Sequence, residues 1–322
     1  MIITRTPLRI SFTGGGTDIR DFYQADGGAV VSMAINKYIY ITVNQKFDRS
    51  IRISYSKTEI VNSLDEVQHE LIRECMKMAG VTDSIEITSI ADIPSGTGLG
   101  SSSAFTVGVL NALYTYKGNR LSSNQLAEMA CDIEINVLKN PIGKQDQYAA
   151  ANGGLNCIRF LPDETVLIDK ITLPEDGLRS MRQKLMMFYT GITRSANAIL
   201  SEQRKHTAQK MDSLRFMRDQ ALTMYETLTT DGFTGDFAKA LQQGWEKKRE
   251  LAGTITNPEI NRLYDKAIAA GASGGKLLGA GGGGFLLFYC DEEYQQAVRE
   301  AIGLRQIDFA LDTYGSRVIF FA

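Results

Sequence analysis

The chain has 322 residues, of which 43% are hydrophobic and 22% are charged, and its formal net charge at pH 7 is -2. These values are typical of a soluble globular protein large enough for two domains, and they argue against nucleic acid or a membrane as the main partner. The four cysteines are widely spaced and the chain has only two histidines, which argues against a zinc site, a disulfide framework and a serine or cysteine hydrolase.

The first part of the chain is predicted to form strands. β-Branched residues alternate or cluster over residues 8–13, 29–35, 39–44, 51–55 and 85–88, as is typical of strands in a sheet. The sequence begins directly with the strand-like MIITRTPLRISF, and its apolar runs are far shorter than a bilayer span. We therefore expect a cytoplasmic protein.

Helical periodicity appears later, at residues 67–79, 104–116 and 123–138. After Pro174 the pattern changes to longer, charged amphipathic helices at 194–206, 211–228, 237–252 and 258–270. The chain then returns to strands, at 285–290 and 317–321, around a helix at 292–302. This change of pattern predicts an α+β protein with an N-terminal domain at residues 1–178 and a C-terminal domain at residues 179–322.

A glycine-rich loop, IPSGTGLGSSSAF at residues 93–105, precedes the predicted helix at 104–116. Gly96, Gly98 and Gly100 allow the main chain to approach a ligand closely, and the start of a helix offers free N–H groups and a positive dipole end. The loop therefore predicts a phosphate site, although a tight strand-to-helix turn is the other interpretation. It matches neither the dinucleotide fingerprint nor the P-loop pattern.

A second glycine-rich segment, GASGGKLLGAGGGGFLLFYC at residues 271–290, leads into a predicted strand. Its four consecutive glycines, residues 281–284, carry an entropy cost that close backbone approach would justify. Alone, the segment is equally consistent with a flexible hinge. Together with the first loop, it favours a ligand between the two domains.

Three segments resemble, in order and spacing, the signature motifs of the small-molecule kinases named for galactokinase, homoserine kinase, mevalonate kinase and phosphomevalonate kinase (GHMP kinases). They are RTPLRISFTGGGTD (5–18), PSGTGLGSSSAF (94–105) and KLLGAGGGGF (276–285). The resemblance covers the whole chain, and GGAVVSMAINKYIYITVN, GKQDQYAAANGG and YTGITRSAN are most similar to the bacterial heptose 7-phosphate kinases of this family. It implies a two-domain fold, with an N-terminal mixed sheet of left-handed crossover topology and a C-terminal ferredoxin-like α/β sandwich.

The resemblance also implies the roles of residues on the nucleotide side. Asp146 matches the family's catalytic base or orienting carboxylate, and Arg9 matches the basic residue that stabilises its charge. Ser102 and Glu134 match the Mg²⁺ ligands. The residues that would bind the phosphates of ATP are Pro94, Gly96, Thr97, Gly98, Leu99, Gly100, Ser101, Ser102 and Ser103. Without the family, Asp146 reads as a turn residue, Arg9 as an edge-strand arginine and Glu134 as part of a solvated helix face.

On the substrate side, the resemblance implies that Asp18 binds sugar hydroxyls, although a capping role is the alternative. The neighbouring substrate residues would be Gly15, Gly16 and Thr17, with Gly281, Gly282 and Gly283 from the third motif. GGGTD stands where galactokinases have GEHTD, so galactose itself is not expected. A sugar substrate that already carries a phosphate needs cationic side chains to bind that phosphate. Motif context favours Lys144 and Arg194 for this role, although both could instead be surface charges.

We therefore expect an enzyme that uses ATP and Mg²⁺ to phosphorylate the anomeric hydroxyl of D-glycero-D-manno-heptose 7-phosphate, for the synthesis of nucleotide-activated heptose. The expected partner is this small sugar phosphate, and the expected assembly is a monomer or homodimer. Three alternatives stay open: a kinase of a fucose-like or galactose-like sugar, a non-catalytic sensor of sugar and ATP, and a decarboxylase of a diphosphorylated acid on the same fold.

Overall fold

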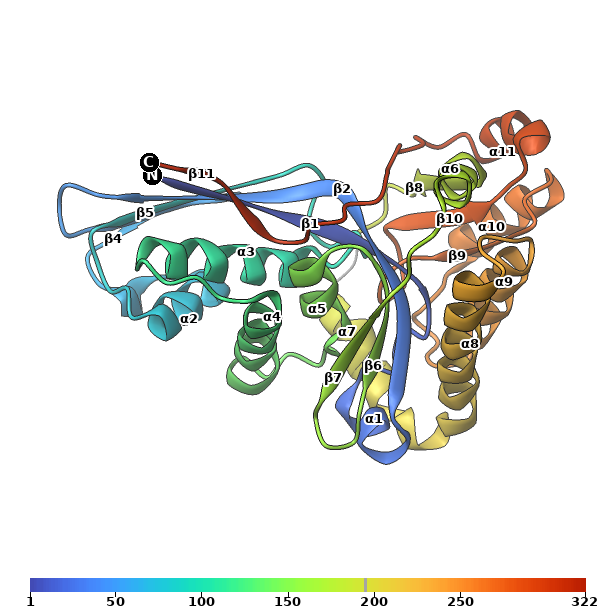
Figure 1. Cartoon of the computed structure of the whole chain (residues 1–322), viewed down its shortest axis with the longest axis horizontal. Helices are drawn as coiled ribbons and strands as arrows, with labels where there is room; N and C mark the ends of the chain where they lie inside the picture. Colours follow the sequence, from blue (N-terminus) through green and yellow to red (C-terminus); the bar gives the residue numbers. More distant parts are fainter. Residues whose placement is uncertain (194–195) are drawn as a thin grey trace.

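The computed structural model describes residues 1–193 and 196–322. Its strands form two separate sheets, one of eight strands and one of three. The large sheet and its helices hold most of the N-terminal half of the chain, and the small sheet lies among the helices of the C-terminal half (Figure 1). This arrangement is the two-domain α+β fold that the sequence predicts.

The large sheet is mixed. Its main path runs through β11 (Arg317–Phe321), β1 (Ile2–Thr13), β2 (Gly28–Gln45), β5 (Ile85–Ala91), β3 (Ile51–Ser54) and β4 (Thr58–Val61). From this path, β6 (Leu155–Phe160) pairs with β2, and β7 (Val166–Lys170) pairs with β6. Among the strands that the structure describes, β3 and β5 are the only neighbours in this sheet that run parallel.

Five helices and two short turns accompany this sheet. They are α1 (Arg20–Asp26), η1 (Leu64–Glu66), α2 (Glu70–Ala79), α3 (Ser101–Tyr116), α4 (Ser123–Cys131), η2 (Asp132–Val137) and α5 (Gln145–Asn152). Helix α3 is packed against β1 and β2 and is covered by α2, α4 and α5. It is apolar on most faces because it is enclosed on most faces, and its first residues carry the three serines of the phosphate motif.

The small sheet is antiparallel, in the order β8 (Leu185–Tyr189), β10 (Phe285–Tyr289) and β9 (Gly274–Leu277). On the free side of β8, Phe188 forms an isolated bridge with Gln306, just after α11 (Gln295–Ile302). The spatial order is therefore that of a ferredoxin-like sandwich whose fourth strand is reduced to a bridge. The expectation for the C-terminal half is confirmed.

The remaining helices are α6 (Glu175–Lys184), α7 (Ala196–Lys205), η3 (Thr207–Gln209), α8 (Met211–Thr230), α9 (Asp236–Arg249), α10 (Pro258–Ala269) and η4 (Glu292–Tyr294). Helix α8 contacts α9 and also β2, so it joins the two halves. Helix α9 lies on β9, where a Cβ at Gly274 would be 2.1 Å from the backbone oxygen of Ala238. None of the helices in the described ranges is long and apolar enough to cross a membrane.

The structure adds elements that the sequence did not predict, among them α1, α5, α6 and the strands β4 and β6 to β9. It also changes the form of two predicted elements and places a third in the sheet. The strands expected at 29–35 and 39–44 are one strand, β2, which continues through a shift of register in its pairing with β1. At this shift, Asn36 and Lys37 have no partner in β1, and Asn36 bonds instead to the backbone of Ala310. The helix expected at 123–138 ends as an α-helix at Cys131 and continues as the π-helical turn η2. The last strand, β11, returns to the large sheet beside β1 (Figure 1). The domain boundary after residue 178 stays a prediction, and it falls inside α6.

Candidate active site

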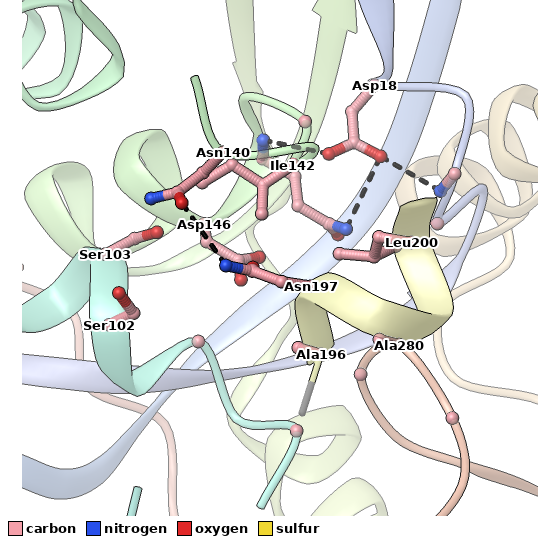
Figure 2. A pocket seen from close by; sticks show the side chains of 18 of the residues that line it. Asp18, Ser102, Ser103, Asn140, Ile142, Asp146, Ala196, Asn197, Leu200 and Ala280 are labelled. Carbon is pink, nitrogen blue, oxygen red and sulfur yellow. Dashed lines mark hydrogen bonds between the residues drawn. The ribbon is translucent and has the colours of Figure 1, made fainter. Parts of the chain in front are cut away.

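A cavity of about 190 Å³ lies where loops of the two halves meet. Its walls contain residues from all three signature motifs, together with side chains of η2, α5, α7 and α9. Figure 2 shows Asp18, Ser102, Asn140 and Asp146 on the side of the large sheet, facing α7 and the third motif. The structure thus brings together segments that lie more than 200 residues apart in the sequence, from Arg9 to Gly283.

The centre of the cavity holds an ion pair between Arg9 and Asp146. The Arg9 Nε donates to Asp146 Oδ1 at 2.7 Å and its Nη2 donates to Oδ2 at 2.8 Å, while Nη1 donates to the backbone oxygen of Gly98 at 2.8 Å. Arg9 is 3% exposed. A bidentate pair of this kind fixes the orientation of the carboxylate as well as its charge. Asp146 lies in the first turn of α5 rather than in a loop turn, and its side chain is 24% exposed. Arg9 is buried, because the loop at Leu99 covers the side of β1 that does not pair with β2.

The glycine loop around residues 96–100 ends at the N-terminus of α3. Gly96, Gly98 and Gly100 all have positive φ, at 74°, 83° and 73°. No side chain caps α3, and the first N–H groups of a helix have no partner within it. Gly96, Gly98, Gly100 and the three serines line the cavity. This set of N–H groups, hydroxyls and dipole is suited to an anion.

The other three residues of the predicted phosphate-binding set, Pro94, Thr97 and Leu99, support the loop and do not line the cavity. The Thr97 hydroxyl donates to the backbone oxygen of Pro94 at 2.9 Å. The backbone oxygen of Leu99 accepts a hydrogen bond from the Arg9 N–H at 3.0 Å. The loop is therefore held in register with β1, which carries Arg9.

Ser102 and Glu134 form a hydrogen-bonded pair of oxygen donors. The Ser102 hydroxyl donates to Glu134 Oε1 at 2.9 Å, and Gln147 Nε2 donates to Oε2 at 2.7 Å. Glu134 is fully buried in the π-helical turn η2, so it does not belong to a solvated helix face. Burial raises the pKa of Glu134 to about 7, against the opposite effect of the hydrogen bonds from Gln147, Ser103 and Ser102.

This pair fits a magnesium ion. The described residues contain no group of three or more histidine, cysteine or carboxylate side chains that could hold a metal by themselves. Mg²⁺ is commonly held by one or two carboxylates together with substrate phosphates, so one carboxylate and one hydroxyl next to a phosphate loop suffice. Gln147, which fixes the second oxygen of Glu134, is a positioning residue that the sequence did not indicate.

At the other end of the cavity, Asp18 is held by backbone N–H groups. Its Oδ1 accepts from Gly16 N at 2.9 Å and its Oδ2 accepts from Gln145 N at 3.2 Å (Figure 2). Gly143 packs so closely that a Cβ there would lie 1.9 Å from Oδ2. Burial, reinforced by the nearby Asp146, raises the pKa of Asp18. Asp18 and the neighbouring Gly15 and Gly16 line the cavity.

Thr17, predicted to belong to the same substrate group, faces away from it. Its hydroxyl donates to the backbone oxygens of Gly14 and Ala29 at 2.8 and 2.9 Å, and the residue is fully buried. The substrate role predicted for Thr17 is therefore replaced by a structural one: it ties the first motif to β2.

The third motif packs directly on the second. A Cβ at Gly279 would lie 2.3 Å from Gly98 Cα, and a Cβ at Gly284 would lie 2.1 Å from the backbone oxygen of Thr97. Gly281 and Gly283 line the cavity, whereas Gly282 donates its N–H to the backbone oxygen of Ile255 at 2.8 Å. These close contacts between main chains explain the glycines and argue against a free hinge.

Of the two cationic residues predicted to bind the substrate phosphate, only Lys144 lies within the described residues. The Lys144 ammonium pairs with Glu164 and lies 4.9 Å from the centroid of the Tyr23 ring, in a separate pocket. The structure therefore does not bring Lys144 to the cavity, because the hairpin between β6 and β7 supplies a carboxylate that binds it. Arg194 lies outside the described residues.

Sequence reasoning missed five polar side chains of the cavity: Asn140, Gln145, Asn197, Gln203 and Lys248. Asn197 on α7 donates from Nδ2 to Asn140 Oδ1 at 3.2 Å, across the face of the cavity above Asp146 (Figure 2). Lys248 on α9 is 6% exposed and donates to the backbone oxygen of Gly279. The signal for Lys248 was present: it follows Leu241 and Trp245 at helical spacing, so it lies on the apolar stripe of its helix.

Comparisons with known proteins agree with this geometry. The family model for the N-terminal domain of GHMP kinases matches residues 65–154, and the model for their C-terminal domain matches residues 227–306. A curated relative from Campylobacter jejuni, a D-glycero-alpha-D-manno-heptose 7-phosphate kinase, is 30% identical over 98% of this chain and 97% of its own length.

Two solved structures share the fold over nearly the full length. The crystal structure of a D-glycero-D-manno-heptose 1-phosphate kinase from Bacteroides thetaiotaomicron has a TM-score of 0.83 and 24% identity, with 100% of both chains covered. A putative sugar kinase from Campylobacter jejuni has a TM-score of 0.78 and 27% identity, over 98% of this chain and 97% of its own.

Proposed function

The chain belongs to the GHMP kinase family, and we propose that it transfers the γ-phosphoryl group of ATP to the anomeric hydroxyl of D-glycero-D-manno-heptose 7-phosphate. Membership of the family makes it a small-molecule kinase, and the heptose phosphate kinases among its relatives support a sugar kinase. Kinases of this family use ATP, generally with Mg²⁺. The heptose and the anomeric position go beyond family membership. Heptose 7-phosphate is the substrate named for the Campylobacter jejuni relative, and the GGGTD form of the first motif sets this chain apart from galactokinases.

The observation that carries the proposal is the bidentate Arg9–Asp146 pair at the end of the glycine loop. Phosphoryl transfer requires positioning and charge neutralisation more than covalent chemistry. A Cβ at Gly100 would lie 3.2 Å from Asp146 Oδ2, so the carboxylate is next to the loop proposed to bind phosphate. A sugar hydroxyl placed between them would meet its base and its phosphoryl donor together.

Asp146 would accept the proton of the acceptor hydroxyl. As this proton leaves, a bond forms between the sugar oxygen and the γ-phosphorus, and the bond from that phosphorus to the ADP oxygen breaks. The products are ADP, the sugar 1,7-bisphosphate and one proton. Arg9 keeps the carboxylate in position for this step, and Asp18, at the far end of the cavity, would accept hydrogen bonds from sugar hydroxyls.

Ser102 and Glu134 would hold Mg²⁺, which neutralises phosphate charge when bound. The N–H groups of residues 96–103 would bind the phosphates of ATP. These assignments are supported by the uncapped start of α3 and by the oxygen pair beside it.

The experiment is a substrate screen. Purified protein is incubated with ATP, Mg²⁺ and a panel of free sugars and sugar phosphates, and ADP release is measured. We expect heptose 7-phosphate to be turned over with a much higher kcat/KM than free heptose, fucose or galactose. Higher activity on a free sugar would replace the proposed substrate, and ATP binding without turnover of any sugar would favour a sensor.

A further inference from the structure

The cavity contains a second cationic side chain, Lys248, which lies outside all three signature motifs. Lys248 is in the last turn of α9 and is almost completely buried. Among the described residues, its ammonium has one hydrogen-bond acceptor, the backbone oxygen of Gly279. An ammonium group has three N–H donors, so Lys248 retains donors for a ligand in the cavity.

The two neighbouring cations have less capacity to bind a ligand. Arg9 directs its guanidinium at Asp146 and at the backbone oxygen of Gly98. Lys276 on β9 donates to the backbone oxygens of Ser11 and Phe12 at 2.9 and 2.7 Å. Lys276 therefore links the two halves of the molecule, whereas Lys248 faces the cavity.

The position of Lys248 follows from a chain of contacts. Its ammonium bonds to Gly279, and Gly279 packs on Gly98 of the phosphate loop with no room for a Cβ. Gly98 in turn accepts a hydrogen bond from Arg9, which holds Asp146. Lys248 is therefore at the junction of the phosphate loop and the proposed base, where donor and acceptor would meet.

We propose that the ammonium of Lys248 binds the phosphoryl group while it passes from ATP to the sugar. In this transition state, negative charge is spread over the non-bridging phosphoryl oxygens, and a fixed cation in a buried site stabilises it strongly. Lys248 exchanges no proton in this step, because the hydroxyl proton goes to Asp146. The inference rests on the proposed function, and it adds a catalytic residue supplied by the C-terminal half.

A substrate phosphate group is the other possible phosphate ligand of Lys248. If the anomeric hydroxyl is at Asp146, the 7-phosphate lies at the opposite end of the heptose. The contacts of Lys248 are with the transfer end of the cavity, so the γ-phosphoryl group is the better match. The two cases differ in kinetics: a cation for the phosphoryl group acts on kcat, whereas a cation for the 7-phosphate acts on the KM of the sugar phosphate.

The charged surroundings of Lys248 predict a pH dependence. The groups around it are Arg9 from β1, Lys276 from β9, Asp18 from the loop after β1, and Asp146 from α5. Burial, together with the positive charge of Arg9, lowers the pKa of Lys248 to about 8, against the opposite effect of the two carboxylates. The catalytic cation is then lost as the pH rises through about 8 in the free enzyme.

The test compares Lys248→Met and Lys248→Arg with a matched control, Lys247→Met. Lys247 is the preceding residue in α9, but it is only partly buried, does not line the cavity, and is paired with Glu250 at 3.0 Å. We expect Lys248→Met to lower kcat by about 10²–10³-fold, as removal of a transition-state donor does, with both KM values nearly unchanged. Lys248→Arg should keep part of the activity and shift the alkaline limb of kcat/KM for ATP to higher pH. The control should match the wild type.

Two outcomes would overturn the inference. The first is a folded Lys248→Met variant with normal kcat and a raised KM for the sugar phosphate alone, which would place the 7-phosphate at Lys248. The second is normal kinetics with only a lower melting temperature, which would make Lys248 a structural link to Gly279. If Lys248→Met does not fold, Lys248→Gln is measured by the same criteria.

Intrinsic ATP hydrolysis separates this inference from the proposed substrate. Water replaces the sugar in that reaction, so the rate depends on Lys248 whatever the true acceptor is. Loss of hydrolysis in Lys248→Met, in an enzyme that does not act on heptose 7-phosphate, would support the lysine and reject the substrate. Unchanged hydrolysis in Lys248→Met, in an enzyme that does phosphorylate the heptose, would reject the lysine alone.

Discussion

Asp146 is the residue on which the proposed chemistry depends most. We expect Asp146→Asn to lower kcat by roughly 10²–10⁴-fold, with little change in the KM for ATP, because the amide cannot accept the hydroxyl proton. Steady-state kinetics with both substrates measures this. Asp132→Asn, an exposed carboxylate at the start of η2, is the control. A purified Asp146→Asn enzyme with near-normal turnover would remove Asp146 from the mechanism.

The folded protein is more stable when Glu134 is protonated, whereas Mg²⁺ binding requires its ionised form. Its pKa, about 7, is above the ordinary value of 4.5 because the side chain is buried. The folded state therefore binds this proton more tightly than the unfolded state does. The resulting stability is fully present below pH 4.5 and is lost as the pH rises through about 7.

We therefore expect Glu134→Gln to unfold at a higher temperature than the wild type at pH 8 without Mg²⁺, and this advantage to shrink toward pH 5. The gain is at most about 3 kcal/mol, since one pKa unit corresponds to about 1.4 kcal/mol. The same variant, like Ser102→Ala, should need more Mg²⁺ for half of its maximal rate. Thermal melts and Mg²⁺ titrations measure the two effects. An unchanged Mg²⁺ requirement would return Glu134 to a purely structural role.

At the residue scale, the signature motifs predicted that Arg9, Asp18 and Asp146 belong to one site, and all three line the same cavity. Their roles stay predictions. Lys144 could not be excluded from sequence, because its partner Glu164 lies 20 residues away in a hairpin that no pattern indicated. Lys248 lines the cavity but was not predicted, because it stands in the charged run WEKKRE, which is typical of a solvent-exposed helix face. Only its position on the buried stripe of α9 distinguishes it from its neighbours.

At the element scale, the two glycine-rich loops act as one unit, since Gly279 and Gly98 are in contact through their main chains. Sequence alone favoured a ligand as the reason for these glycines. The structure shows an additional reason, which is the close approach of one loop to the other. A side chain at this contact would separate the loops and displace both walls of the cavity.

We expect Gly279→Ala to lower both stability and activity, the former by about 2 kcal/mol or more. The Cβ would lie 2.3 Å from Gly98 Cα, and the φ of 72° is strained for alanine. Chemical denaturation and kcat/KM measure the loss. Gly235→Ala is the matched control, because its φ is -62° and no atom lies within 4 Å of the added Cβ. Equal stability of the two variants would contradict the contact between the loops.

Most long elements could be predicted because their periodicity is strong. The long helices α8, α9 and α10 and the strands that precede the phosphate motif appear where expected. The short helix α5 was missed since QDQYAAAN has no amphipathic period, yet it carries Asp146. The π-helical turn around Glu134 could not be predicted either, because one added residue per turn leaves no mark on the hydrophobic pattern. Such turns are frequent at functional sites.

At the scale of the whole molecule, the cavity exists only where the two halves meet. Lys276 on β9 bonds to the backbone of β1, and Arg204 and Arg215 pair with Asp21 and Asp26 of α1. These contacts place the third motif against the phosphate loop. The sequence predicted two domains with a ligand between them, but it could not show that β11 returns to the first sheet, since pairing between the chain termini leaves no local pattern.

The central claim is that the enzyme forms a phosphate ester at the anomeric carbon of a sugar that already carries a phosphate. Phosphorus NMR of the product made from D-glycero-D-manno-heptose 7-phosphate, ATP and Mg²⁺ tests this most directly. We predict two phosphomonoester signals of equal area, one coupled to the anomeric proton and one to the protons at carbon 7, together with the signals of ADP. A second ester coupled to any other ring proton, or ADP formed with only inorganic phosphate, would contradict the claim.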